Sequence, residues 1–102
     1  MSKKNKIIKQ VITTIRYSGE SICVSFDDIT RIDACRIGAE LINQRICNSF
    51  GVEWCGQTEL WLDNVDSAAL NGFEVEYFIL EVIKEIAAEM NKEIVFVGSM
   101  QK

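Results

Sequence analysis

Residues 73–92, FEVEYFILEVIKEIAAEMNK, repeat apolar side chains every three or four positions. At about 100° per residue, this spacing gathers the apolar groups on one face of a helix. That face holds Val75, Ile79, Val82, Ile83, Ile86, Ala87 and Met90. The opposite face holds Glu74, Tyr77, Glu81, Lys84, Glu85, Glu89 and Lys92. An alternating strand over 73–80 is the competing interpretation, but it does not explain the stripe that continues to Met90. The sequence therefore predicts a helix over 73–92.

Strand patterns lie on both sides of this helix. Residues 52–64, VEWCGQTELWLDN, favour one strand that is interrupted by a bulge or bend near 55–57. Residues 94–97 form a continuous apolar strand before Gly98. A helix between two strands is long enough to let them run parallel.

The first half of the chain predicts a hairpin followed by a helix. Residues 7–17 are rich in β-branched side chains, which favours a strand, although positions 8, 11, 12 and 15 also fit a helical stripe. The turn residues 18–20 then lead into an alternating strand over 22–26. Asp27 and Asp28 would cap a helix that ends at Gly51, with an apolar face made of Ile32, Cys35, Ala39, Ile42 and Ile46.

These elements predict an α+β fold in ββαβαβ order. We expect a two-layer sandwich, in which a mixed four-stranded sheet carries both helices on one face. The length of 102 residues suits a single domain over 1–102, with residues 1–6 as a basic, flexible tail. The apolar runs are too short for a signal peptide or a membrane span, so we expect a soluble, cytoplasmic protein.

Composition argues against most catalytic chemistry. The chain has no histidine, so neither a Ser-His-Asp nor a Cys-His site can be built from it. Its four cysteines, Cys23, Cys35, Cys47 and Cys55, form no CxxC pair, and we expect neither a metal site nor a cofactor. Cys35 and Cys47 are expected to be small apolar filler within a helix, and redox activity of any cysteine stays open. An enzyme is not expected.

The sheet pattern predicts that something covers part of its second face. Residues 60–62 and 94–97 carry large apolar side chains in both directions, whereas a sheet with one wet face should alternate. Three candidates could cover this face: a second copy of the chain, the N-terminal segment or a foreign partner. Trp54 and Trp61 are the expected anchors, because tryptophan is enriched at binding hot spots.

Charge is divided unevenly along the chain. The net charge of −4 combines eight bases and five acids in residues 1–51 with three bases and ten acids in residues 52–102. The acids gather on one face of the second helix and just before it. We expect a negative surface that steers a basic partner protein.

The sequence thus favours a small protein-binding module of the inhibitor or immunity-protein type. The predicted partner-binding residues are Trp54, Trp61, Asp63, Asp66, Glu74, Phe78, Glu81, Glu85 and Glu89. The main alternative is a homodimeric small-ligand or regulatory domain. An enzyme based on the carboxylates of Asp63 and Asp66, or a protein that binds nucleic acid through its lysine-rich start, is less well supported.

Overall fold

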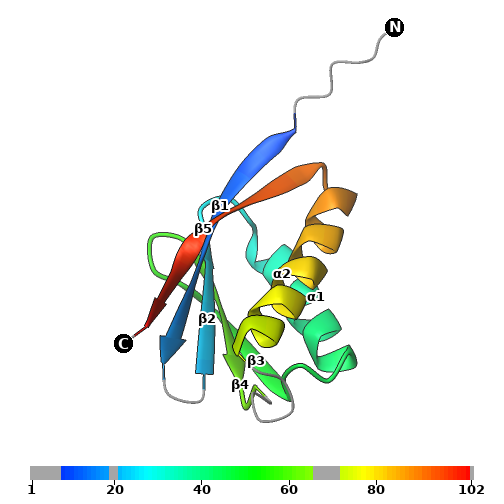
Figure 1. Ribbon diagram of the computed structural model, residues 1–102. Coiled ribbons are helices and arrows are strands. Elements are labelled where there is room, and N and C mark those ends of the chain that lie inside the picture. The colour runs from blue at the N-terminus through cyan, green and yellow to red at the C-terminus, as the bar shows by residue number, and fades with distance from the viewer. Residues whose placement is uncertain (1–7, 19–20, 66–71, 102) are drawn as a thin grey trace, which may run out of the picture.

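The computed structural model describes residues 8–18, 21–65 and 72–101, and at 72–74 and 99–101 it describes the backbone alone. Five strands and two helices follow one another in the order ββαββαβ (Figure 1). Their bounds are β1 Lys9–Ser18, β2 Ser21–Phe26, α1 Arg31–Asn43, β3 Ser49–Trp54, β4 Thr58–Asp63, α2 Gly72–Glu89 and β5 Lys92–Gln101.

The strands form one mixed sheet in the order β3-β4-β2-β1-β5. Only β1 and β5 are parallel neighbours, and the other three pairs are antiparallel. It follows that β4 and β5, which are joined through α2, run in the same direction, as the sequence predicted. They do not pair with each other, however, because β2 and β1 lie between them. Both helices cover one face of the sheet (Figure 1). The α+β class and the mixed sheet with two helices are confirmed.

The prediction of four strands is wrong, because residues 52–64 form a hairpin instead of one bulged strand. Trp54 pairs with Thr58, and the three residues between them reverse the chain. Gly56 has a φ of 77°, a left-handed conformation that glycine adopts without steric cost. The Cys55 N–H donates to the carbonyl of Gln57 at 3.0 Å and closes the turn. Gly56, which the sequence analysis assigned to a bulge or bend, therefore lies in a turn that reverses the direction of the chain between β3 and β4.

The N-terminal hairpin is confirmed, with β1 and β2 paired from Ser18–Ser21 back to Thr13–Phe26. The last strand is longer than predicted and continues past Gly98 to Gln101. Its pairing with β1 shifts where Phe96 opposes Thr13 and Gly98 opposes Thr14, which leaves Val97 as an extra residue. This β-bulge lets the strand pass through Gly98, whose φ is 136°.

The bounds predicted for the first helix are wrong at both ends. Thr30 is the N-cap, and its Oγ1 accepts from the Asp33 N–H at 3.1 Å. The two aspartates bond to β1 instead: Asp27 accepts from the Ile12 N–H at 2.8 Å, and Asp28 pairs with Lys9 at 2.9 Å. Arg45, with a φ of 63°, follows the end of the helix. The predicted terminator Gly51 lies inside β3.

The buried face of α1 also differs from the predicted one. Four residues of the helix face the core: Ala34, Ile37, Gly38 and Leu41. The predicted apolar residues of the helix point outward, and Ile32 is 76% exposed. Cys35, Ala39 and Ile42 are exposed as well, and Ile46 is buried but lies beyond the helix. The sequence of α1 therefore allows two apolar faces, the predicted one and the one that contains Ile37 and Leu41. Packing of the Phe50 ring against Gly38 turns the second of these faces toward the core.

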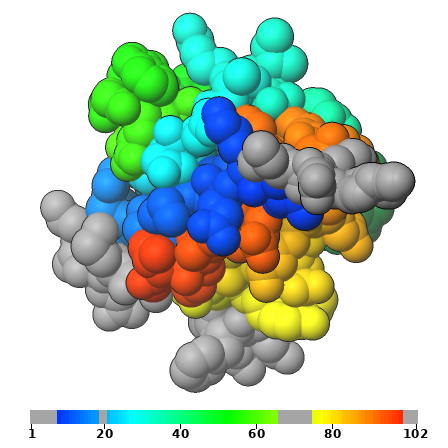
Figure 2. All heavy atoms as spheres, turned by 90° about the horizontal axis from the view of Figure 1, so that it is seen from above, coloured from blue at the N-terminus to red at the C-terminus, as the bar shows by residue number. Residues whose placement is uncertain are grey.

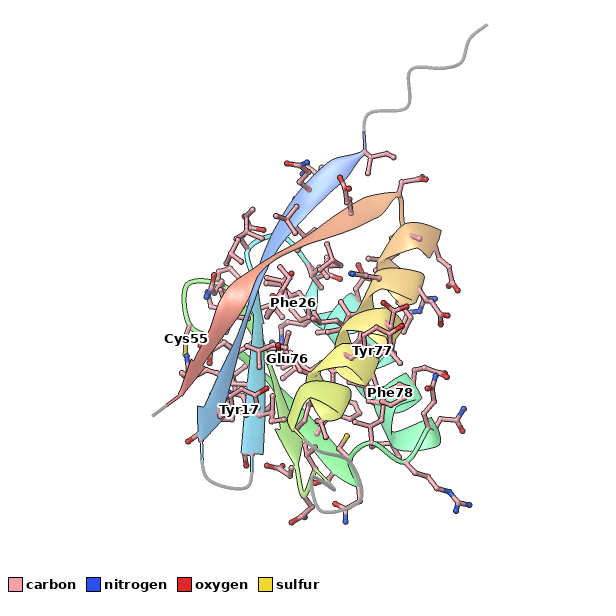
Figure 3. All side chains as sticks on the ribbon, viewed as in Figure 1. Tyr17, Phe26, Cys55, Glu76, Tyr77 and Phe78 are labelled. Atoms are coloured by element: carbon pink, nitrogen blue, oxygen red, sulfur yellow. The ribbon has the colours of Figure 1, made fainter. Side chains whose placement is uncertain are left out.

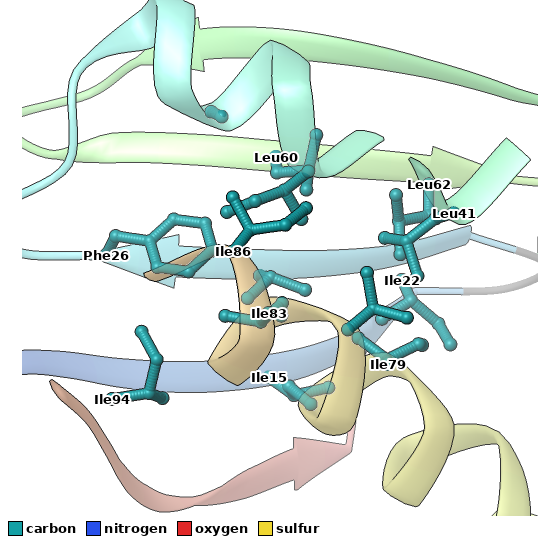
Figure 4. Packing of buried hydrophobic residues seen from close by; sticks show 14 of the residues in the cluster. Ile15, Ile22, Phe26, Leu41, Leu60, Leu62, Ile79, Ile83, Ile86 and Ile94 are labelled. Carbon is teal, nitrogen blue, oxygen red and sulfur yellow. The ribbon is translucent and has the colours of Figure 1, made fainter. Parts of the chain in front are cut away.

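The second helix buries the face that its sequence predicts. Val75, Ile79 and Ile83 are at most 2% exposed, and Met90, predicted as the last residue of the stripe, follows the helix and is partly buried. The helix ends at Glu89, three residues before the predicted limit. Its side chains meet those of α1 and the sheet in one continuous core (Figure 4). Leu60 and Leu62 of β4 are fully buried in that core.

Candidate functional site

Apart from Trp54, the predicted binding residues whose side chains the structure describes lie on two separate surfaces. The first, which we name the helical surface, is the exposed arc of α2 made of Tyr77, Phe78, Glu81, Lys84, Glu85, Ala88 and Glu89. The second, the open sheet face, is the side of the sheet that the helices leave uncovered. Trp61 and Asp63 belong to the open sheet face. Glu74 lies in α2, but its side chain is not among those described, and Asp66 lies outside the described residues.

An aromatic pair stands at the N-terminal end of the helical surface. Tyr77 is 59% exposed and Phe78 is 41% exposed, with their ring centroids 5.6 Å apart in an edge-to-face arrangement. Both project from the outer side of α2 (Figure 3). Because the pair is held by its own T-shaped contact, it offers apolar area that needs little reordering to bind. The sequence selected Phe78 but did not select Tyr77 as a binding residue.

Carboxylates line the same surface, and not all are neutralised. Glu81 approaches the ammonium group of Lys84 at 4.0 Å, and Glu89 accepts from the Arg36 guanidinium on α1 at 2.7 Å. Among the described residues, Glu85 has no hydrogen-bond or ion-pair partner. The structure therefore brings together Phe78 and the three glutamates as predicted, with a negative charge that is left uncompensated at Glu85.

A groove of about 620 Å³ continues this surface between the two helices. It is lined by Arg36, Ala39, Glu40, Asn43, Glu85, Ile86 and Glu89. Three carboxylates face one guanidinium there, so the groove keeps a negative balance. An ionised partner in such a groove would be cationic.

The open sheet face is covered at its centre by its own side chains. Arg16, Cys23, Trp61 and Gly51 lie in one row across β1, β2, β4 and β3. The Arg16 guanidinium lies 5.4 Å from the centroid of the Trp61 ring, and Cys23, between them, is fully buried. This cation–π contact explains how small residues of β2 are buried without a second layer. At the centre of this face, Arg16 and Trp61 of the chain itself therefore cover Cys23.

A buried glutamate lies in the next row of the open sheet face. Glu59 is only 9% exposed, and its Oε1 accepts from the Trp61 Nε1–H at 3.3 Å. Its Oε2 lies 3.9 Å from Arg16. Directly opposite, on β3, stands the exposed Glu53. Cys55, in the turn of the hairpin, completes a group whose ligand atoms lie within 4.8 Å of one another.

The sequence did not point to this group, because it assigned residues 52–64 to one strand. With a hairpin closed at Gly56, Glu53 and Glu59 become direct cross-strand neighbours. The sequence does carry a signal for this group, because Glu53 lies three residues before Gly56 and Glu59 three residues after it. If Gly56 is assigned to a hairpin turn, the two acids are predicted to face each other across the strands.

Asp63 ties three strands together. It accepts from the hydroxyl of Ser21 on β2 at 3.0 Å and from that of Ser49 on β3 at 3.4 Å. Both carboxylate oxygens are therefore engaged in joining strands. This arrangement offers no support for a role of Asp63 in acid–base catalysis.

The two tryptophans do not form one anchor. Trp54 pairs with Thr58 at the end of the hairpin and is 65% exposed. Thr58 in turn donates to the carbonyl of Ile29 at 2.6 Å, which places this end of the hairpin beside the start of α1. Trp61 lies on the opposite face and is partly buried under Arg16. Only Trp54 presents a largely free indole ring.

The cysteines divide into two pairs. Cys23 and Cys47 are buried, and burial raises the pKa of both thiols above the ordinary value, as expected for apolar filler. Cys35 and Cys55 are exposed. The prediction that Cys35 is core filler is wrong, because α1 turns its other face inward.

Comparison of the chain with protein-family models, curated proteins and solved structures gave no significant match. Among the described residues, no helix is both long and apolar enough to cross a membrane. The function is therefore argued from the two surfaces alone.

Proposed function

We propose that the protein is a binding module that engages a basic surface of a partner protein through its helical surface. The observation that carries the proposal is the exposed Tyr77–Phe78 pair on the same face of α2 as Glu85, a carboxylate without a partner among the described residues. Aromatic anchors supply contact area, and surrounding charge supplies orientation and speed of association. An inhibitor or immunity-type role fits this chemistry, because such a protein acts by occupying a surface.

The negative groove between α1 and α2 supports the same proposal. It shares Glu85 and Glu89 with the helical surface, and Glu40 of α1 lines it as well. A lysine or arginine of the partner would find carboxylates on both helices there. Trp54 lies on the hairpin and is not part of this surface.

Affinity capture with a matched pair of variants tests the proposal. The full chain is immobilised and exposed, at low and at high salt, to lysate of the cells from which the protein comes. The first variant, Phe78→Ser with Glu85→Lys, alters the helical surface. The control, Ile32→Ser with Glu93→Lys, likewise replaces one apolar side chain by serine and one glutamate by lysine, at exposed positions elsewhere.

We expect the wild-type chain and the control to retain the same protein at low salt, and the first variant to lose it. High salt should weaken the retention, because screening reduces steering between charged surfaces. Equal retention by both variants, or no protein retained by the wild-type chain, would contradict the proposal.

A second candidate is a homodimer that joins two open sheet faces, as in a small regulatory domain. Exposed apolar side chains beyond the covered centre favour it: Ile12 is 39% exposed on β1, and Val97 is 57% exposed at the bulge of β5. These two strands lie side by side (Figure 2). Light scattering at micromolar concentration decides this candidate, since the monomer mass of 11.6 kDa would exclude the dimer.

A further inference from the structure

We propose that two copies of this chain associate edge to edge, through β3 and the outer side of α1, in a dimer with twofold symmetry. The two β3 strands pair antiparallel in this dimer, so that two five-stranded sheets join into one. The interface differs from that of two stacked open sheet faces, because it uses the edge of the sheet. It also leaves the helical surface on α2 free.

The strand β3 is a sheet edge without the usual protection. The other edge strand, β5, carries a bulge at Val97 and passes through Gly98, which bends it away from pairing. In contrast, β3 pairs regularly with β4 over its whole length and contains one charged residue, Glu53, and no lysine. Among the described residues, no backbone group bonds to its outer side. An edge of this kind is a template for a further strand.

Apolar side chains line this edge on the helix-covered side of the sheet. Phe50 and Val52 lie opposite Leu62 and Leu60, which are buried in the core. Trp54 points to the same side, because alternate residues of a strand share a face. Phe50 and Val52 are only partly buried, and Trp54 is 65% exposed. Their free area lies at the edge, where a second copy would cover it.

A twofold axis at Val52 pairs these side chains with one another. Val52 would face Val52 of the second copy, and Phe50 would face Trp54 of the second copy, an aromatic cross-strand pair of the favourable kind. On the open sheet face, Glu53 would lie opposite Gly51 of the second copy. This register therefore opposes no like charges directly.

The helix layer fits the same arrangement. α1 contacts both β3 and β4, so it lies over this end of the sheet (Figure 1). Because neighbouring strands are about 4.8 Å apart, joining the two β3 edges would place the two α1 helices about 10 Å apart, the usual distance of packed helices. The ion pair of Arg36 with Glu89 marks the side of α1 that faces α2. The other side faces the edge.

An exposed stripe on α1 complements itself across the twofold axis. The stripe is made of Ile32, Cys35, Ala39 and Ile42, all exposed. Their spacing is symmetric about position 37, so antiparallel pairing sets Ile32 against Ile42 and Cys35 against Ala39 of the second copy. The small residues at the centre allow close approach, and the isoleucines fill the ends. Such self-complementarity is what a twofold interface requires.

One axis serves both the helices and the strands. Gly38, next to the centre of the stripe, packs on the ring of Phe50, two residues from the proposed centre of the strand pairing. The centres of the two patterns therefore lie one above the other. Independent patterns on two elements would not have to coincide in this way.

The charges of α1 favour an antiparallel partner. Arg31, in its first turn, is exposed and has no hydrogen-bond or ion-pair partner among the described residues. A cation there opposes the positive end of its own helix dipole, and the last turn of α1 contains no basic residue. In the dimer, Arg31 would lie beside the C-terminal turn of the second α1, whose negative end it complements.

The area of the interface sets the expected affinity. The six residues of β3 and the thirteen of α1 each span about 20 Å. Two layers of this length form a face of about 400–600 Å² on each copy, or about 800–1,200 Å² in total, at the lower end of specific interfaces. We therefore expect a reversible dimer that dissociates in the micromolar range.

Sedimentation velocity of the full chain, from micromolar to half-millimolar concentration, tests the proposal. We expect the mass to rise from 11.6 kDa toward twice that value. Trp54→Ser should weaken the association by at least about tenfold, because it removes the aromatic pair from the edge. Val97→Ser is the matched control, since Val97 is 57% exposed but lies on β5, and it should associate like the wild-type chain. Circular dichroism verifies that both variants are folded.

Cross-linking of the wild-type thiols locates the interface. Cys35 lies two positions from the centre of the stripe, so its two copies would be about 6 Å apart along the helix axis. Cys55 lies three residues beyond Val52, so its two copies would be about 20 Å apart along the strands. A short bismaleimide should therefore give a covalent dimer with the wild-type chain and with Cys55→Ser. Cys35→Ser should give none.

Three results would overturn the proposal. One is a monomer at half-millimolar concentration. Another is association that Val97→Ser weakens as much as Trp54→Ser does, which would indicate stacked sheet faces instead. The third is a covalent dimer that persists in Cys35→Ser or is lost in Cys55→Ser. Because the capture experiment reports on α2, its outcome does not decide this one.

Discussion

Phe50 lies flat against Gly38, so closely that a methyl group at position 38 would stand 2.6 Å from the ring carbons. The contact joins β3 to α1 and fixes which face of the helix turns inward. It also explains why a glycine, normally unfavourable within a helix, lies in the middle of α1.

We expect Gly38→Ala to destabilise the protein by about 1–2 kcal/mol. Alanine gains helix propensity, but the clash with Phe50 costs more than that gain. Chemical denaturation measures the effect. Gly51→Ala is the control, because no atom lies within 4 Å of the added methyl group there, and it should change the free energy of unfolding by less than about 0.5 kcal/mol. Equal effects at both positions would contradict the packing argument.

The observed face of α1 predicts a contrast between two isoleucines. Ile37→Ala should cost about 2–5 kcal/mol, because Ile37 is fully buried and its loss leaves a cavity. Ile32→Ala should cost less than about 0.5 kcal/mol, since Ile32 is 76% exposed. Urea titration of both variants compares them directly, and the reverse order would restore the face predicted from sequence.

The Tyr17 hydroxyl donates to Glu76 Oε2 at 2.6 Å and ties the end of β1 to α2 (Figure 3). Burial, reinforced by the bonded carboxylate, raises the pKa of Tyr17 above the ordinary value. The unfolded tyrosine ionises near pH 10, so the unfolded chain loses its proton first. Stability should therefore fall as pH rises above about 10.

Tyr17→Phe checks this expectation. It should cost about 1.5 kcal/mol at neutral pH through the lost bond to a charged acceptor, and it should flatten the alkaline decline. Denaturation at a series of pH values measures both effects. Tyr77→Phe, at an exposed tyrosine, is the control and should follow the wild-type curve. An equally steep decline in Tyr17→Phe would remove the role assigned to this hydroxyl.

The two glutamates of the hairpin should respond to neutralisation in opposite directions. Glu53→Gln should stabilise the protein by about 0.2–1 kcal/mol, because it removes a like-charge pair. Glu59→Gln should destabilise it by about 1 kcal/mol, since the buried side chain loses its ion pair with Arg16 and accepts a weaker hydrogen bond from the Trp61 N–H. Thermal melts of both variants test this difference, and stabilisation by Glu59→Gln would show that its charge is not compensated at all.

Local patterns determined part of the fold. The periodicity of 73–92 specifies both the helix α2 and its buried face, because seven apolar residues agree on one direction. The alternation over 22–26 and the turn before it likewise specify β1 and β2 as a hairpin. For the helical surface, the same periodicity placed Phe78, Glu81, Glu85 and Glu89 together, since residues on one helix share a face whatever the rest of the chain does.

Tertiary structure decided what local patterns left ambiguous. The segment 31–43 carries two competing apolar stripes, and only the approach of Phe50 to Gly38 makes one of them the buried face. Whether Gly56 bends a strand or reverses it depends on which strands pair, and that pairing joins Glu53, Cys55 and Glu59. The sequence by itself thus determined elements that are stabilised by their own periodicity. Contacts between residues on different elements, which no local pattern encodes, determined the face of α1 and the cluster on the hairpin.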